Sequence, residues 1–383
     1  MSADDDLVAA VDAKNLKSAQ AAIAAGASPN AKDKRGMLVL KTSCVRKQKG
    51  LARALIDAGA DVNATDEKGR AALHWLAEEL AEADLAKLCI EKGAKVDQLD
   101  TEKYTQVSPL HRAVKRPKLD FAQALLEGGA NVDVRDYEGH TPLMLLCKSE
   151  SGVMSKTEME NAKWLVARGA DVNAANDDGE TPLMFAAGSG REMTEFLLGK
   201  HAKVTSNKWQ MTPLYYCLST NDKDKALWDL LISAGCDVNH DGERGTPLRE
   251  AQTCWNPTAV AYLLAKGADP NVKDERGETP LESAIQLKQD KIIKLLESAA
   301  NAGAPVKAKP PAPAPAAAPA KSAATTPAAK PVAAKKPVAK KAAAKNPAKN
   351  PAKNAPTKKP AAKKSAAKKS AAKKPVKKPA RSK

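Results

Sequence analysis

Apolar side chains recur along most of the chain as short clusters with helical spacing, and each cluster ends at a glycine. The segments from Ala122 to Leu126 and from Glu192 to Leu198 are typical, because their paired leucines fall on one face of a helix. A glycine at the end permits the left-handed backbone at which many helices stop. The closing glycines are Gly26, Gly59, Gly93, Gly129, Gly169, Gly235 and Gly267.

These glycines follow one another at intervals of 33, 34, 36, 40, 66 and 32 residues. The interval of 66 is two periods, since Lys200, His201 and Ala202 occupy the intermediate place. A period near 33 residues predicts an array of structural repeats.

A second motif in each period predicts the start of another short helix. Ser or Thr is followed by Pro and Leu. The hydroxyl can cap exposed N–H groups, Pro suits the first helical position because it has no N–H, and Leu begins the buried face. The repeating unit is therefore helix, turn, helix and loop. The motif begins at Ser108, Thr141, Thr181, Thr212, Thr246 and Thr279.

These residues resemble the ankyrin repeat. The run from Asp136 through Gly139 to Leu143, closed by Gly169 to Asn173, follows the family pattern closely. The resemblance implies an all-α solenoid, in which helix pairs stack side by side and hairpin-like loops project from them beside a concave face.

The resemblance covers Asp4 to Ser298, which we interpret as about nine units. Asp4 to Asn30 is the expected N-terminal cap, and Asp274 to Ser298 is the expected C-terminal cap. We therefore predict two parts, a solenoid over residues 1–298 and a disordered basic tail over residues 299–383.

Some units depart from the pattern. The second reads Gly36-Met-Leu-Val-Leu40 and the third begins at Ala71 without Thr-Pro, yet we expect both to fold by stacking on their neighbours. Extra residues lie between Asp100 and Ser108 and between Ser149 and Thr157. Insertions in repeat arrays map to loops, often on a functional face.

The net charge of +17 hides two segments of opposite sign. No acidic residue follows Glu297, whereas 23 of the 62 Lys and Arg residues do, so the earlier part holds 39 basic and 45 acidic side chains. The segment from Pro305 onward holds 15 of the 25 prolines and no aromatic residue. Such a composition cannot bury enough apolar surface to order the chain, and it predicts disorder.

The sequence offers no catalytic motif and no cofactor motif. The five histidines lack metal-ligand spacing, and the six cysteines lie far apart, as expected for reduced core thiols. His74 and His111 occupy the place where the resemblance implies a histidine that bridges loops by hydrogen bonds. We expect no enzyme activity, metal, cofactor or small-molecule substrate.

Neither a secretory signal nor an 18-residue apolar stretch is present, which predicts an intracellular protein without a membrane span. The expected compartment is the cytoplasm, or the nucleoid or nucleus if the tail binds DNA.

Two surfaces are candidates for an unidentified protein partner. The first is a stripe one residue after the histidine position, on the side that the resemblance makes concave, with packing between helices as the alternative. Its members are Trp75, Arg112, Leu145, Phe185 and Tyr216. The second surface is the loop tips, which carry residue types common in binding hot spots. Its members are Tyr104, Tyr137, Trp209 and Arg244.

The tail is a candidate for non-specific binding of DNA, RNA or another polyanion, because its lysine pairs recur about every five residues, as in linker-histone-type tails. The pairs are Lys358 and Lys359, Lys363 and Lys364, Lys368 and Lys369, Lys373 and Lys374, and Lys377 and Lys378. We predict a non-enzymatic interaction scaffold with a polycationic tail. The alternative is an adaptor whose tail folds onto its own acidic body, or serves only as a spacer.

Overall fold

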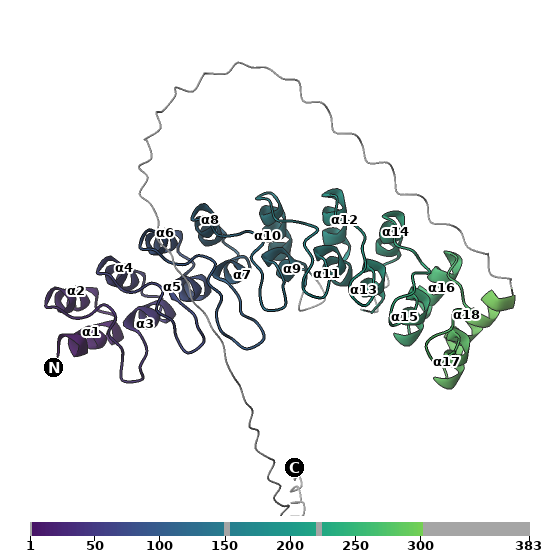
Figure 1. Ribbon diagram of the computed structural model, residues 1–383, viewed down its shortest axis with the longest axis horizontal. Coiled ribbons are helices and arrows are strands. Elements are labelled where there is room, and N and C mark those ends of the chain that lie inside the picture. Colours follow the sequence, from purple (N-terminus) through teal and green to yellow (C-terminus); the bar gives the residue numbers. More distant parts are fainter. Residues whose placement is uncertain (1, 149–153, 220–223, 302–383) are drawn as a thin grey trace, which may run out of the picture. The chain divides into compact units, whose positions relative to one another are not determined.

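The computed structural model describes residues 2–148, 154–219 and 224–301. Within these ranges the chain forms nine consecutive helix pairs, which we call units one to nine, and the predicted all-α repeat solenoid is confirmed (Figure 1). The first helices of the units are α1 (Ala3–Asp12), α3 (Val39–Val45), α5 (Ala72–Trp75), α7 (Pro109–Ala113), α9 (Pro142–Cys147), α11 (Pro182–Ser189), α13 (Pro213–Ser219), α15 (Pro247–Thr253) and α17 (Pro280–Gln286).

The second helices lie beside them in a second layer (Figure 1). They are α2 (Leu16–Ala24), α4 (Lys49–Asp57), α6 (Ala83–Glu91), α8 (Asp120–Glu127), α10 (Lys156–Val166), α12 (Arg191–Gly199), α14 (Lys225–Ser233), α16 (Pro257–Ala265) and α18 (Asp290–Asn301). Each first helix contacts the first helix of the next unit. The buried apolar side chains between stacked units form two clusters, one from Leu7 to Ala202 and one from Ala187 to Leu296, and Val204 packs against both. The only strand-like pairings in the described ranges are two isolated bridges, at Lys32 with Leu38 and at Gly242 with Gly245.

The local signals act largely as predicted. All seven closing glycines have positive φ, between 84° at Gly93 and 108° at Gly235, and His201 takes the same left-handed conformation at the intermediate place. Hydroxyls cap the first helices at Ser108, Thr141, Thr246 and Thr279. The buried Thr181 hydroxyl has no partner among the described residues, so in that unit Pro182 and packing define the helix start.

The units that depart from the pattern still form helix pairs. In unit three a π-helical turn, η1 (Leu76–Leu80), follows α5 and ends at Ala81, whose φ is 50°. The residues between Asp100 and Ser108 form a projecting loop in which Tyr104 has a φ of 93°. The insertion predicted from Ser149 to Thr157 lies partly outside the described residues, and α10 begins at Lys156 within it.

Candidate protein-binding surface

The loops between units are joined to one another by backbone hydrogen bonds at their tips. The Thr101 N–H donates to the Lys68 carbonyl at 2.7 Å, and the Tyr137 N–H donates to the Thr105 carbonyl at 3.0 Å. Three further bonds continue the series toward the C-terminus. They join Asp177 to Glu138 at 3.0 Å, Lys208 to Asp178 at 2.9 Å and Glu243 to Trp209 at 3.0 Å. We call the tips of these loops, which connect units two to eight, the loop ledge.

Glycine makes the close approach of the loops possible. A Cβ atom added at Gly139 would lie 2.8 Å from the Asp177 backbone nitrogen, and one at Gly69 would lie 2.7 Å from the Thr101 backbone nitrogen. Both glycines also have positive φ, 79° and 70° respectively. Gly69 and Gly139 each lie three residues after an aspartate, Asp66 and Asp136, in a tight turn. Glycine at this place allows both the turn and the close contact with the next loop.

The ledge exposes the aromatic residues that the loop pattern indicated. Tyr104 is 65% exposed and Tyr137 is 55% exposed, on neighbouring loops that the bond from Tyr137 to Thr105 holds together. Arg244 is exposed and Trp209 is half-buried. Sequence reasoning missed Arg135, whose guanidinium donates to the Ala175 carbonyl at 2.8 Å and ties one loop to the next.

The predicted stripe on the first helices is only partly accessible. Trp75 is 1% exposed and Phe185 is 7% exposed, so these two side chains pack between helices, which is the alternative to a direct contact with a partner. The indole N–H of Trp75 points to Asp66 Oδ2 at 3.3 Å. Arg112, Leu145 and Tyr216 are half-buried and still reach the surface.

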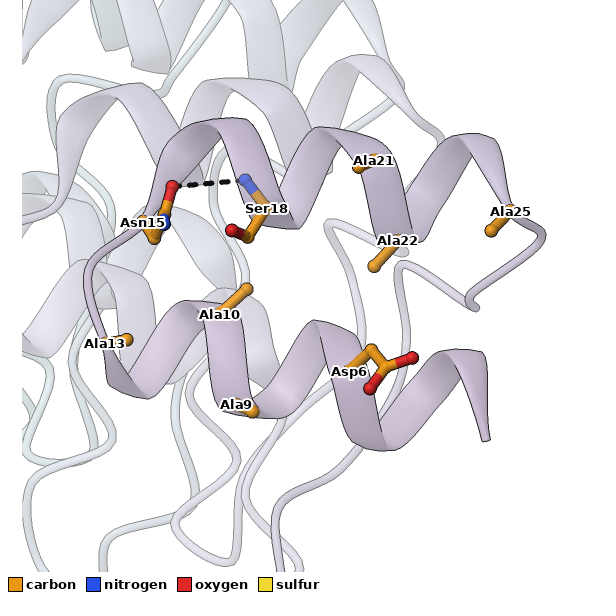
Figure 2. Close-up of a pocket in the computed structure, with 9 residues that line it drawn as sticks. All are labelled: Asp6, Ala9, Ala10, Ala13, Asn15, Ser18, Ala21, Ala22 and Ala25. Atoms are coloured by element: carbon orange, nitrogen blue, oxygen red, sulfur yellow. Dashed lines mark hydrogen bonds between the residues drawn. The ribbon is translucent and has the colours of Figure 1, made fainter. Parts of the chain in front are cut away.

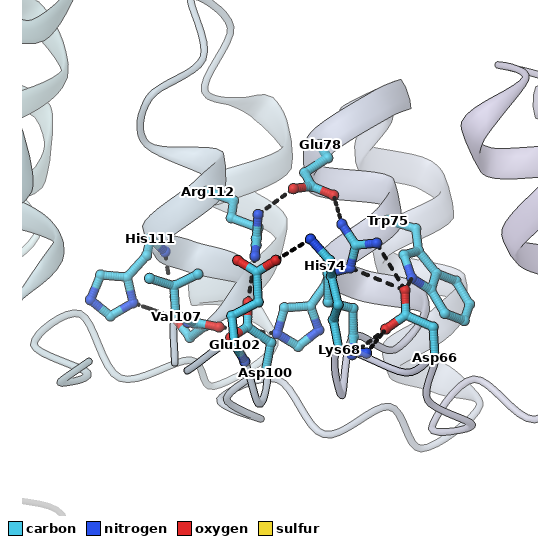
Figure 3. Close-up of polar contacts among 12 residues, drawn as sticks. Asp66, Lys68, His74, Trp75, Glu78, Asp100, Glu102, Val107, His111 and Arg112 are labelled. Carbon is cyan, nitrogen blue, oxygen red and sulfur yellow. Dashed lines mark hydrogen bonds and ion pairs between the residues drawn. The ribbon is translucent and has the colours of Figure 1, made fainter. Parts of the chain in front are cut away.

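Arg112 lies in a chain of ion pairs that crosses three units (Figure 3). Its guanidinium pairs with Glu78 and with Asp100, whose side chain is fully buried. Glu78 also accepts from Arg70 at 3.0 Å, and Arg70 pairs with Asp66 at 2.9 Å. Burial raises the pKa of Asp66, but the hydrogen bonds from Lys41 and Arg70 outweigh it and hold that pKa well below its usual range. These ion pairs hold the side chain of Arg112 in place within the stripe.

A second polar cluster surrounds Tyr216. Its hydroxyl donates to Glu180, and the Asn207 amide donates to that hydroxyl at 3.0 Å. The Phe185 ring lies 6.4 Å from the Tyr216 ring, and burial together with Glu180 raises the pKa of Tyr216. No sequence pattern indicates this cluster, because Glu180 and Asn207 lie in loops, where polar residues are ordinary.

The two histidines in the family's position bridge loops, as the resemblance implied. His74 Nδ1 accepts from the Ala71 N–H, and its Nε2 faces the Val107 carbonyl in the next loop at 3.2 Å. His111 repeats the arrangement with Ser108 and with the His140 carbonyl at 3.1 Å. Burial, with a smaller contribution from the Arg112 charge, lowers the pKa of His74 to about 4, and burial also lowers that of His111. Both imidazoles are therefore neutral structural groups at pH 7.

The cysteines, the possible metal ligands and the apolar helices show no further site in the described residues. Five of the six cysteines are buried, Cys254 is half-buried, and none of the six forms a disulfide. The described residues gather no cluster of three or more side chains suited to a metal ion. No helix in the described ranges combines the length and the apolar character needed to cross a membrane. The ten tail lysines from Lys358 to Lys378 lie outside the described residues.

The family model for ankyrin repeats in three copies matches residues 7–100, 80–155, 152–240 and 221–306. A neurogenic locus notch homolog protein 4 from Homo sapiens is 38% identical over 71 residues, which are 18% of this chain and 4% of that protein. A transient receptor potential cation channel subfamily A member 1 homolog from Caenorhabditis elegans is 45% identical over 60 residues, 15% of this chain and 5% of that protein.

The chain thus spans only a small fraction of these relatives' length. The family matches, in contrast, run continuously from residue 7 to residue 306 and coincide with the nine stacked units. The chain belongs to the ankyrin repeat family, and its repeats form a protein-interaction scaffold.

Proposed function

We propose that the array works by binding and not by catalysis, and that it holds a protein partner on the loop ledge and the adjoining half-buried face of the first helices. The observation that carries the proposal is the exposure of Tyr104 and Tyr137 on loops already joined by a backbone hydrogen bond. Tyrosine supplies a large contact area with few rotatable bonds, and it is enriched among binding hot spots.

The rigidity of the ledge supports this assignment. Five hydrogen bonds between neighbouring loops fix their relative positions before any partner arrives. Binding then orders fewer groups, which lowers the entropic cost of association. Arg112, held by Glu78 and Asp100, extends the fixed surface onto the first helices next to the ledge.

Affinity capture with matched variants of the full chain tests the proposal. The bait Tyr104→Ser/Tyr137→Ser removes both exposed rings from the ledge. The control bait Trp255→Ser removes an equally exposed ring, 58% accessible, from the turn between α15 and α16. We expect one set of proteins to be retained by wild type and by the control and lost from the double variant. Equal retention by all three baits would contradict the ledge as the binding surface.

A second proposal concerns the tail, which we infer binds a polyanion such as DNA or RNA without reading its sequence. The supporting observation is 23 basic residues after Glu297 with no acidic and no aromatic residue among them. Phosphate contacts would supply the affinity, and no aromatic ring is available to stack on single-stranded bases. The protein would then act in the cytoplasm, or at the nucleoid or nucleus if the polyanion is DNA.

A salt titration against random-sequence duplex DNA tests the tail proposal. If about ten lysines engage phosphates, log K should fall with log salt at a slope of about −9. The comparison uses the full chain and a chain ending at Ala304. Equal binding by both chains, or binding that ignores salt, would contradict the proposal. Compaction of the full chain at low salt in place of DNA binding would favour the alternative in which the tail folds onto the acidic body.

A further inference from the structure

The two ends of the array differ in how their apolar residues are covered. Each first helix carries a leucine of the repeat motif, and the residue one helical turn after it is apolar in all but one unit. In the first eight units this later residue is at most 1% exposed. These eight are Val11, Cys44, Ala77, Val114, Cys147, Ala187, Leu218 and Gln252. In unit nine the equivalent residue is Ile285, which is 54% exposed.

This comparison shows which way the position faces. Val11 belongs to unit one, the first in the described residues, and is buried, whereas Ile285 belongs to unit nine, the last in them, and is exposed. The position therefore packs against the following unit. The motif leucine follows the same rule, since Leu7 is fully buried in unit one and Leu281 is only half-buried in unit nine. We call the side of a unit that packs against the following unit its forward face. The forward face of unit nine carries the residues of an ordinary contact between units, but no further unit covers it in the described part of the chain.

A recurring hydrogen bond marks the same junctions. The backbone carbonyl of the later residue accepts a bond from a side chain of the following unit in five places. Gln48 reaches Val11 at 3.1 Å, Arg116 reaches Ala77 at 3.2 Å, Asn161 reaches Val114 at 2.7 Å, Ser189 reaches Cys147 at 2.8 Å and Gln289 reaches Gln252 at 2.9 Å. In units two and nine the donor is the amide side chain immediately before the second helix.

In the described part of the chain no unit covers the opposite face of unit one. Its two helices line a shallow groove of small side chains, among them Ala9, Ala13 and Ala21, which are all exposed (Figure 2). Asn15, the residue immediately before α2, lies at the end of this groove. Its position corresponds to Gln48 and Gln289, which are buried and donate to the carbonyl of the preceding unit, whereas Asn15 is exposed.

We propose that copies of this chain associate head to tail, with the forward face of unit nine in one copy packed on the groove of unit one in the next. Ile285 would fill the space between Ala9, Ala13 and Ala21, and Asn15 would donate to the Ile285 carbonyl. The occupant is a second copy because the junction continues the contact that each unit already makes with the next. Terminal units of soluble arrays ordinarily have a polar outer face, which Ile285 and Leu281 do not provide.

Such a contact joins two different surfaces and does not close on itself, so it builds open chains of copies. Two other arrangements would cover the same residues. The chain's own segment after Asn301 could lie on unit nine, or two forward faces could pair with each other. Sedimentation velocity of variants at the two ends distinguishes both arrangements from head-to-tail association.

The test uses sedimentation velocity of the full chain in roughly 0.3 M salt, which screens repulsion between the basic tails. Ile285→Glu places a charge on the forward face, and Ala21→Arg places a charge in the groove. Both positions are exposed in the single copy, so neither change disturbs the core. Tyr104→Glu is the matched control, because it puts a charge at an exposed apolar site in the middle of the array.

We expect the mass of wild type and of the Tyr104→Glu control to rise steadily with concentration, while each end variant alone remains a monomer. An equimolar mixture of the two end variants should form a dimer of twice the monomer mass and nothing larger, because only one intact junction remains. A wild type that stays monomeric at every concentration would overturn the proposal. Association of Ala21→Arg with itself would overturn it too, because it would show two forward faces pairing.

Discussion

Gln289 donates its side-chain amide to the backbone carbonyl of Gln252, 2.9 Å away in the preceding unit, and its side-chain oxygen accepts from Gln252 at 2.7 Å. Both side chains are almost fully buried. The carbonyl belongs to the end of α15, where it also accepts the Trp255 N–H at 3.1 Å. The neighbouring unit therefore adds a buried hydrogen bond to the helix end, which makes the stability of one unit depend on the next.

Gln289→Leu should consequently destabilise the C-terminal units. This change removes one bond to the carbonyl, which keeps the Trp255 N–H, and the closer of the two partners of the Gln252 amide. Losing buried hydrogen bonds in this way costs about 1–3 kcal/mol. Urea unfolding followed by circular dichroism measures the loss. Gln286→Leu is the control, since Gln286 is exposed and its side-chain amide donates to the Glu278 side chain within the same unit-to-loop segment at 2.8 Å. Equal midpoints for the two variants would show that the junction bond adds nothing.

Gly139→Ala should loosen the loop ledge. The new methyl group would meet the Asp177 nitrogen, which donates the bond linking two loops, and the left-handed φ adds a cost of roughly 1 kcal/mol. Gly169→Ala is the matched control, because its φ is 93° and its added Cβ would meet nothing within 4 Å. We expect Gly139→Ala to lose about 1–2 kcal/mol more than the control in urea unfolding. Identical losses would mean that the close approach is relaxed without cost.

Arg112→Met should be among the most destabilising single changes. It leaves the buried Asp100 carboxylate without its cation, and breaking a buried ion pair from one side costs about 3–5 kcal/mol. Arg53→Met, which breaks the exposed pair with Asp84 at 2.7 Å, should cost no more than about 1 kcal/mol. The midpoint of thermal unfolding measures both. If the two changes cost the same, the network near Arg112 is solvated in solution.

Stability should fall as the pH drops from about 6.5 to about 4. In the unfolded chain His74 takes up a proton near pH 6.5, whereas in the folded protein its pKa is about 4, so acid favours the unfolded state. The loss reaches up to ~3 kcal/mol for His74, and His111 adds to it in the same direction. The lowered pKa of Asp66 acts only below this window, where its carboxylate becomes protonated.

Urea midpoints at pH 7, 6 and 5 measure this slope. The variant His74→Gln/His111→Gln keeps hydrogen-bonding side chains at both sites but cannot take up a proton. Its midpoint should change much less over the same range. A slope as steep as that of wild type would assign the acid sensitivity to other groups.

The repeat fold was readable from the sequence because its signals are local. Gly93 and Gly169 close helices, Ser108 and Thr141 open them, and each unit repeats the pattern. The burial of Trp75 and Phe185 was not readable, since residues at the same place in the repeat frame differ in exposure, as the half-buried Leu145 and Tyr216 show. The ledge depends on contacts between loops more than thirty residues apart, such as Tyr137 with Thr105, and no local pattern encodes these.

Hydrogen exchange of the full chain, alone and bound to the captured partner, tests the central claim most directly. If the partner binds the ledge, backbone amides in residues 100–107, 134–140 and 205–211 should exchange more slowly in the complex. Amides in the second helices α4, α8 and α12 should exchange at the same rate with and without the partner. Protection confined to those second helices, with the three loop segments unchanged, would contradict the account.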